Sequence, residues 1–275
     1  MSRSPAIFTR LLIVFVFVSL AACVPAAASP TPAPKAATLT VMAAASLTVP
    51  FNELGRQFEV QHPNVKVEFS FAGSQQLAQQ LSSAAPADVF ASASPKYMDA
   101  TVSAKRVDAG AVKNFVSNRL VMIVPAGNPA GLKQLGDLSR PGLKLVLAAK
   151  AVPVGQYALD FLDKAVKDPA YGSTYKDQVL KNVVSYEDNV KSVLTKVQLG
   201  EADAGIVYTT DSAGDAAAKV IQIAIPDALN VIAVYPIAPI TNSANPSLAN
   251  AFIDLVLSPS GQAVLAKYGF LPPPE

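Results

Sequence analysis

The chain has very little of the chemistry on which most enzyme and metal sites depend. Its 275 residues include one cysteine, one histidine and no tryptophan. A single cysteine excludes a disulfide within the chain, and the Cys and His counts exclude zinc sites of the usual spacing. A serine–histidine nucleophile would need His62, in the turn Gln61-His62-Pro63, beside a reactive serine, and no G-x-S-x-G elbow is present. A secreted hydrolase is therefore only a remote alternative.

An excess of charge of one sign is also missing. The chain has 22 basic and 20 acidic residues. Two of the basic residues, Arg3 and Arg10, lie in an N-terminal segment without acidic residues, so 20 of each sign remain when that segment is left out. No basic stripe interleaved with aromatic residues is present, which argues against nucleic acid as a partner. Any anion site in such a chain must attract its ligand by local dipoles rather than by net charge.

The N-terminal segment is typical of a leader and not of a folded element. An apolar run over residues 11–20 follows the two arginines; it is short for a membrane span and has the layout of a secretory signal. The sequence Leu20-Ala21-Ala22-Cys23 resembles the lipobox of bacterial lipoproteins, in which the cysteine is lipidated and becomes the new N-terminus. We expect a signal peptide over 1–22, a lipid on Cys23 and an Ala/Pro-rich tether over 23–37. The alternative is a spare thiol after an ordinary signal peptide.

The remaining 240 or so residues are enough for two lobes with cores of their own. Strand and helix patterns alternate along them, which predicts an α/β fold with mostly parallel sheets. The strict alternation at 65–71, with Val65, Val67, Phe69 and Phe71 on one face, predicts a half-covered strand. The expected strands are 38–44, 65–71, 87–92, 119–125, 143–148, 183–186, 204–208, 220–225 and 231–240. The expected helices are 49–60, 74–83, 95–104, 154–167, 175–181, 189–199, 246–257 and 260–268.

Two strand-to-helix corners each place a serine where a helix should begin. They are Ala43-Ala44-Ala45-Ser46-Leu47 and Phe71-Ala72-Gly73-Ser74-Gln75. The start of a helix presents unpaired N–H groups and a partial positive charge, so it favours anions. Since ligands of α/β sheets bind beyond the carboxyl ends of the strands, both corners are well placed for a common site.

Three further stretches offer donors of the same kind. Val152-Pro153-Val154-Gly155 opens a helix with the N–H of Val154, and its glycine would let the backbone approach a ligand closely. Asn189 is a good N-cap, which would leave the N–H of Val190 unpaired. The strand 204–208 ends in Tyr208, whose hydroxyl can donate. No Arg or Lys falls at these corners, and donors without acceptors select fully deprotonated oxyanions.

Together these stretches resemble the ModA-type molybdate-binding proteins, the solute-binding components of molybdate ABC transporters. The resemblance spans about residues 39–270 and rests on the order and spacing of AAASL (43–47), FAGSQQLAQQL (71–81), APADVFASAS (85–94), VPVGQYA (152–158), EDNVKSVLTKVQLGEADAGIVYTTD (187–211) and YPIAPI (235–240). It implies a type II periplasmic-binding fold, in which two crossing strands join two α/β lobes around the ligand. We expect lobe 1 at 38–120 and 237–275, lobe 2 at 121–236, and crossings near 118–124 and 234–240.

The resemblance also implies a set of ligand-binding residues. Ser46 and Ser74 would bind the anion through hydroxyl and N–H, Val154 and Val190 through N–H, and Tyr208 through its hydroxyl, so that molybdenum is held only through the oxygens of its oxyanion. Val154 stands where the family usually has alanine, which could alter the size of the cleft. The implied protein is a monomer and not an enzyme. It has no cofactor, and it binds molybdate and tungstate outside the cytoplasm. A lipid anchors it to the membrane, in the periplasm if the host has an outer membrane. It delivers its ligand to an ABC permease.

Each of these residues also has a plain structural interpretation. The serines could be simple helix caps, and Tyr208, Val154 and Val190 could be ordinary core residues. Asp88 could order a turn or act as an acid or metal ligand. Glu187 and Asp188 could be a solvated turn or could join an expanded coordination shell, as in a related class of tungstate and molybdate binders. Sulfate or another small solute on the same fold remains the second hypothesis.

Overall fold

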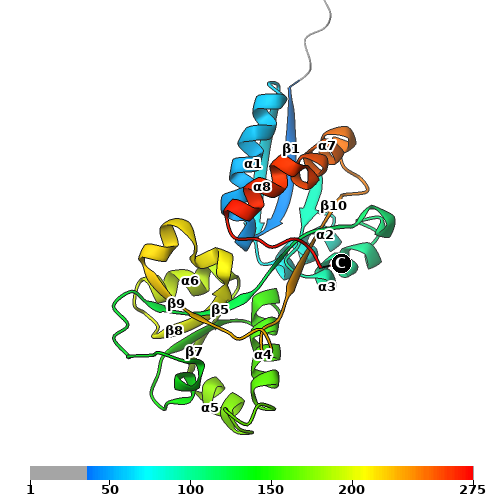
Figure 1. The fold of residues 1–275 in the computed structure, drawn as a ribbon. Coiled ribbons are helices and arrows are strands. Elements are labelled where there is room, and N and C mark those ends of the chain that lie inside the picture. The colour runs from blue at the N-terminus through cyan, green and yellow to red at the C-terminus, as the bar shows by residue number, and fades with distance from the viewer. Residues whose placement is uncertain (1–35, 275) are drawn as a thin grey trace, which may run out of the picture. The chain divides into compact units, whose positions relative to one another are not determined.

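The computed structural model describes residues 36–274, so the predicted leader, Cys23 and most of the tether lie outside the described residues. This part of the chain builds two α/β lobes, each around a five-stranded sheet (Figure 1). The strand order is β2-β1-β3-β10-β4 in the first sheet and β7-β6-β8-β5-β9 in the second. The α/β class with two lobes, expected from the sequence, is thus confirmed.

Lobe 1 is assembled from both ends of the described chain. Its strands are β1 (Ala37–Ala44), β2 (Val65–Ala72), β3 (Val89–Ala91), β4 (Lys113–Asn118) and β10 (Ala233–Pro239). Its helices are α1 (Thr48–Gln61), α2 (Ser74–Ser82), α3 (Pro95–Ser103), α7 (Pro246–Leu257) and α8 (Pro259–Lys267), with the short 3-10 turns η1 (Ala45–Leu47) and η2 (Ala109–Ala111).

Lobe 2 is one continuous piece of chain. Its strands are β5 (Leu120–Pro125), β6 (Leu145–Ala148), β7 (Val183–Glu187), β8 (Ala204–Tyr208) and β9 (Val220–Ala224). Its helices are α4 (Pro153–Ala165), α5 (Tyr175–Lys181) and α6 (Val190–Gln198), with the 3-10 turns η3 (Leu135–Ser139), η4 (Thr209–Ser212) and η5 (Gly214–Ala218).

The sheets are mixed rather than mostly parallel, which corrects the expectation from the sequence. In lobe 1, β2, β1 and β3 pair in parallel, whereas β10 is antiparallel to both of its neighbours. In lobe 2, β5 is likewise antiparallel to β8 and β9. The reason is the path of the chain: β5 and β10 enter their lobes from the junction, so they run away from it, while their neighbours run towards it. The carboxyl ends of the other strands therefore face the junction between the lobes.

The junction consists of two connections. Arg119 alone separates β4 of lobe 1 from β5 of lobe 2, and residues 225–232 lead from β9 back to β10. Since β10 pairs with lobe 1 from Ala233 onwards, the expected boundary between 236 and 237 falls inside a strand of lobe 1. The return crossing precedes β10 instead of lying within 234–240. Pro236 marks a register shift in the pairing of β10 with β4, as expected of a residue that cannot donate to a ladder.

Helices cover both faces of each sheet (Figure 1). In lobe 1, α1, α7 and α8 pack together, and Phe252 makes edge-to-face contacts with both Phe51 and Phe58 there. Helices α2 and α3 cover the other face, where Met42, Leu77 and Phe90 belong to a separate apolar cluster. The carboxyl ends of β1, β2 and β3 lie level with one another in the sheet, since Ala44 pairs with Ala72 and Ala43 pairs with Ala91.

Within residues 36–274, no single helix has the length and hydropathy needed to cross a membrane; only the bent pair α7–α8, with 61° between its members, meets that test in combination.

Candidate functional site

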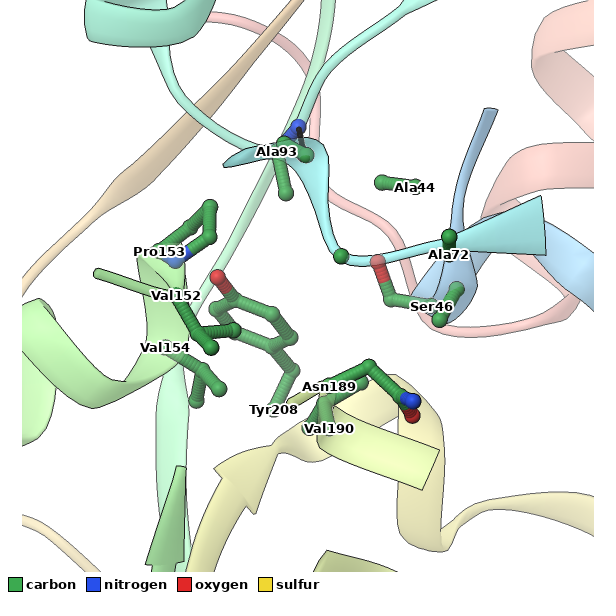
Figure 2. A pocket seen from close by; sticks show the side chains of 13 residues that line it. Ala44, Ser46, Ala72, Ala93, Val152, Pro153, Val154, Asn189, Val190 and Tyr208 are labelled. Carbon is green, nitrogen blue, oxygen red and sulfur yellow. Dashed lines mark hydrogen bonds between the residues drawn. The ribbon is translucent and has the colours of Figure 1, made fainter. Parts of the chain in front are cut away.

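The five proposed ligand-binding residues converge on one pocket between the lobes. Lobe 1 contributes the ends of β1, β2 and β3, and lobe 2 contributes the ends of β6, β7 and β8. Ser46, Ser74, Val154, Val190 and Tyr208 all line it. Figure 2 shows Tyr208 reaching into this pocket from lobe 2, between Val154 on one side and Ser46 on the other. The pocket lies where a ligand of an α/β sheet is expected, beyond the carboxyl ends of the strands.

Ser74 is the first residue of α2, and its hydroxyl does not cap that helix. Instead, the backbone N–H of Ala93 donates to Ser74 Oγ over 3.0 Å. Among residues 36–274 this is the only hydrogen bond of Ser74 Oγ, so the hydroxyl proton is available for a ligand. The N–H of Ser74 has no intrahelical acceptor either, since it belongs to the first turn. Ser74 therefore offers the pocket two donors.

Ser46 lies in η1, directly before α1, and it also makes no cap hydrogen bond. Its hydroxyl oxygen is 2.9 Å from the hydroxyl oxygen of Tyr235 on β10. Ser46 is 96% buried and lines the pocket, and Tyr235 is the hydrogen-bond partner of its hydroxyl among the described residues. The interpretation of both serines as simple helix caps is thus wrong.

Two helices of lobe 2 begin at the pocket. Helix α4 starts with Pro153 in its first turn, followed by Val154. Helix α6 starts at Val190 and is capped by Asn189, whose Oδ1 accepts the N–H of Ser192 over 3.0 Å. This cap confirms the prediction for Asn189 and leaves the N–H of Val190 free of an intrahelical acceptor. The valine side chains are buried, so their core role and an N–H contact with a ligand are compatible.

The Tyr208 hydroxyl is a buried polar group without a partner. Tyr208 is 99% buried, and no hydrogen-bond partner for its hydroxyl is found among residues 36–274. An unpaired buried hydroxyl costs free energy, so such groups are uncommon unless something else binds them. Burial raises the pKa of Tyr208 well above its ordinary value. The phenol therefore keeps its proton and acts as a donor at any physiological pH.

The pocket is small and carries no charged side chain. None of the residues that line it is Asp, Glu, Lys, Arg or His. The centre of a water molecule could move through only about 10 Å³ of it, so the pocket is compact. Elsewhere in residues 36–274, no group of three His, Cys, Asp or Glu side chains could hold a metal ion. The arrangement fits a small compact anion whose charge is met by hydrogen-bond donors and helix dipoles.

The lobes contact each other beside the pocket, so the structure is a closed arrangement. Gln75 Nε2 donates to the carbonyl oxygen of Asp188 over 2.8 Å. The Tyr157 hydroxyl donates to Ala93 O over 3.4 Å, and the Tyr97 hydroxyl donates to Ala151 O. Each of these bonds joins a residue of one lobe to the backbone of the other.

Two glycines at the corners serve close approaches of backbone. A Cβ on Gly155 would lie 2.2 Å from Ala149 O and 2.4 Å from Ala148 O. Gly155 thus lets the first turn of α4 pack against the backbone at the end of β6. The sequence predicted a close approach of this backbone to a ligand, whereas the contacts observed are with Ala148 and Ala149. A Cβ on Gly73 would lie 2.5 Å from Asp188 O. The lobes can close to this distance because residue 73 has no side chain.

The titratable residues singled out in the sequence lie away from the pocket lining. Asp88 is a structural carboxylate: it accepts the N–H of Thr40 over 2.8 Å and the hydroxyl of Ser243 over 2.6 Å. Glu187 pairs with Lys196 over 2.6 Å. Burial opposes its ionisation, but hydrogen bonds from Lys196 and Ser185 outweigh this and lower the pKa of Glu187. His62 stacks on Phe58 at the far end of α1, with ring centroids 4.1 Å apart.

Tyr235 is the residue near the site that sequence reasoning missed. It is fully buried, and it contacts Ser46 although 189 positions separate the two residues. The motif YPIAPI contains it, but nothing in the local pattern indicates which corner its hydroxyl reaches.

Comparison with known proteins agrees with this geometry. Residues 39–271 match the family of bacterial extracellular solute-binding proteins. The molybdate-binding protein ModA of Mycobacterium tuberculosis is 40% identical over 238 residues, which is 86% of each chain. The chain is a bacterial extracellular solute-binding protein of the ModA family. Its place in that family confirms the resemblance inferred from the sequence motifs.

Solved structures show that the fold of this ModA-family chain is that of the periplasmic binding proteins. The periplasmic molybdate-binding protein of Azotobacter vinelandii matches with a TM-score of 0.73 and 20% identity, over 86% of this chain and all of that one. The sulfate-binding protein SubI of M. tuberculosis matches with a TM-score of 0.76 and 20% identity, over 86% of this chain and 87% of that one. The expected type II two-lobe fold is therefore confirmed. Since binders of two different anions share it, the choice of anion depends on the pocket.

Proposed function

We propose that this protein captures molybdate, and tungstate as well, between its two lobes and delivers it to an ABC permease. The ligand would receive the hydroxyl protons of Ser46, Ser74 and Tyr208 and the backbone N–H groups of Ser46, Ser74, Val154 and Val190. The 40% identity to a ModA protein supports the choice of molybdate.

The observation that carries the proposal is the convergence of neutral donors on one small closed pocket. Ser74 Oγ already accepts from Ala93, the Tyr208 hydroxyl has no protein partner, and no carboxylate lines the pocket. A protonated oxyanion would need an acceptor for its proton, whereas a fully deprotonated one does not. The pocket is therefore suited to a dianion such as molybdate.

The number of donors is sufficient for tight binding. A hydrogen bond to a charged acceptor contributes about 1.5–3 kcal/mol net. Six or seven such bonds, less the costs of association and ligand desolvation, are consistent with a Kd between about micromolar and about nanomolar.

Isothermal titration calorimetry of the purified protein with sodium molybdate tests the proposal. We expect one site per chain and a Kd at or below the micromolar range. A titration without heat, accompanied by no thermal shift, would contradict the proposal. Competition decides between the anions: if sulfate displaces molybdate at equal concentration, the protein is a general oxyanion binder and not a molybdate receptor.

The same proposal includes the cellular setting. The protein acts outside the cytoplasm, in keeping with its family of extracellular solute-binding proteins, and acts as a monomer. It is not an enzyme and needs no cofactor. A lipid on Cys23 holds it at the membrane through the tether, and the permease recognises the closed form. The Cys23→Ala variant should then appear in the soluble extracytoplasmic fraction or the medium, while the wild type remains with the membranes.

A further inference from the structure

Tyr235 is buried behind Ser46, outside the pocket lining, and its ring is fixed from several sides. Edge-to-face contacts join it to Phe270 with centroids 5.5 Å apart, to Tyr208 at 5.9 Å and to Phe115 at 6.4 Å. With the ring held in this way, its hydroxyl oxygen has a defined position 2.9 Å from Ser46 Oγ. Either oxygen could be the donor of this hydrogen bond, so we infer its direction from the other polar neighbours of Tyr235.

Asn118 is the last residue of β4, and its hydrogen bonds show which atom of its side-chain amide faces Tyr235. Asn118 Oδ1 lies 2.9 Å from the backbone nitrogen of Arg119 and 3.1 Å from Thr209 Oγ1. Since a backbone N–H can only donate, the atom that receives it must be the amide oxygen. The amide nitrogen then faces Thr210 Oγ1 at 2.8 Å and the Tyr235 hydroxyl at 3.5 Å.

The direction of the Tyr235–Ser46 bond follows. An amide nitrogen has protons and no acceptor capacity, so it cannot receive the proton of Tyr235. Among residues 36–274, Ser46 Oγ is the only acceptor within 3.5 Å of the Tyr235 hydroxyl, and a fully buried hydroxyl left without an acceptor is costly. Tyr235 therefore donates to Ser46, and the proton of Ser46 is directed at the pocket. Ser74 is held in the same way by the N–H of Ala93.

We propose that Tyr235, oriented by Asn118, is a positioning residue that directs the Ser46 hydroxyl proton at the bound oxyanion. This inference rests on the proposed function. It explains how a rotatable serine hydroxyl, which can donate or accept, favours a fully deprotonated ligand: the bond from Tyr235 turns the Ser46 proton towards the pocket, where an acceptor oxygen is needed to receive it. Polarisation along the chain of hydrogen bonds also strengthens the last donor.

A double-mutant cycle, with molybdate as the probe and calorimetry on the full chain as the readout, tests this proposal. Tyr235→Phe should weaken binding about 3- to 10-fold in the wild-type background, and less than about 2-fold in a Ser46→Ala background. Its matched control is Tyr175→Phe, which removes another buried hydroxyl, bonded to Leu135 O over 2.5 Å within lobe 2. That variant should lose stability and keep its affinity. A merely structural role for Tyr235 would give the same loss of affinity in both backgrounds.

The outcomes separate the two proposals. If the wild type binds molybdate but Tyr235→Phe has no effect, or has equal effects with and without Ser46, the positioning role is overturned and the proposed function stands. If the wild type does not bind molybdate, both are overturned. If Tyr235→Phe does not fold, neutron diffraction from molybdate-bound wild-type crystals decides. The deuteron between the two oxygens should be bonded to Tyr235, and one bonded to Ser46 overturns the proposal.

Discussion

The backbone N–H of Ala93 donates to Ser74 Oγ over 3.0 Å, and this bond joins the end of β3 to the start of α2. Two elements of lobe 1 thereby fix the direction of one hydroxyl. A serine at the start of a helix is usually read as a cap, but here its oxygen is turned to a neighbouring strand. The consequence is a hydroxyl whose proton has no acceptor on Ala93 and can be donated to a ligand in the pocket.

Ser74→Ala is expected to weaken molybdate binding at least about tenfold, because it removes a hydrogen bond to a charged acceptor worth about 1.5 kcal/mol or more. Calorimetry measures the effect. Ser82→Ala is a matched control on the same helix: Ser82 Oγ donates to Ala78 O over 2.8 Å and the residue is exposed. An unchanged Kd for Ser74→Ala would remove Ser74 from the site.

Tyr208→Phe should have opposite effects on stability and on binding. The ligand-free protein should unfold at an equal or higher temperature, because the variant removes a buried hydroxyl without a partner, a group that costs about 1–3 kcal/mol. Molybdate affinity should fall about tenfold, because a donor is lost. Thermal unfolding with and without molybdate gives both values in one series. A lower melting temperature of the ligand-free variant would show that the hydroxyl has a protein partner.

Gly73→Ala should interfere with closure of the lobes. The backbone φ of −61° suits alanine, so the variant should fold normally, but its Cβ would lie 2.5 Å from Asp188 O of the other lobe. We expect at least about tenfold weaker binding and a larger radius of gyration with molybdate, measured by small-angle X-ray scattering. Gly127→Ala is the control, because a Cβ there meets nothing within 4 Å. Tight binding by Gly73→Ala would mean that the lobes need not approach this closely.

Lys191→Met should destabilise the protein in a pH-dependent manner. Lys191 Nζ lies 2.9 Å from Asp211 Oδ1, whose side chain is fully buried. Burial raises the pKa of Asp211 above its ordinary value although Lys191 opposes the shift. The folded state therefore holds a proton on Asp211 more firmly than the unfolded state does, and stability falls as pH rises through that raised pKa. Without Lys191, which lowers the pKa of Asp211, the loss of stability with rising pH should be larger.

We expect Lys191→Met to lose about 3 kcal/mol near neutral pH, the lower end for breaking a buried pair. The loss should shrink as the pH is lowered and Asp211 becomes protonated. Urea denaturation at several pH values measures this difference. Lys66→Met, in an exposed pair with Glu68, is the control and should change little at any pH. A loss that stays constant with pH would contradict the role assigned to Asp211.

Affinity for molybdate should be flat between about pH 6 and about pH 9, where groups with ordinary Tyr, Asp and Glu pKa values do not titrate. No Asp, Glu, His or Lys side chain lines the pocket, and burial holds the pKa of Tyr208 well above its ordinary value. Calorimetry at constant ionic strength tests this. A titration step in the affinity would reveal an ionisable group that acts on the ligand.

Much of the fold was readable from local pattern. The alternation of Val65, Val67, Phe69 and Phe71 predicted β2, and the strand-to-helix corners predicted where Ser46 and Ser74 would lie. This worked because parallel strands end at one edge of a sheet, so that residues distant in sequence share that edge. The strand β4 was missed: only Phe115 and Val116 are apolar within Lys113–Asn118. Its buried Ser117 is paired with Leu271, more than 150 residues away.

The sequence by itself determined the α/β class, the helix starts and the neutral character of the donors, since these depend on residue type and short-range periodicity. Tertiary structure alone decided the reversed direction of β5 and β10, the closeness of Gly73 to Asp188 and the placement of Tyr235 behind Ser46. Each of these depends on how the chain crosses twice between lobes, and long-range packing fixes that path. The direction in which a serine hydroxyl donates is likewise set by a neighbour brought from 189 positions away.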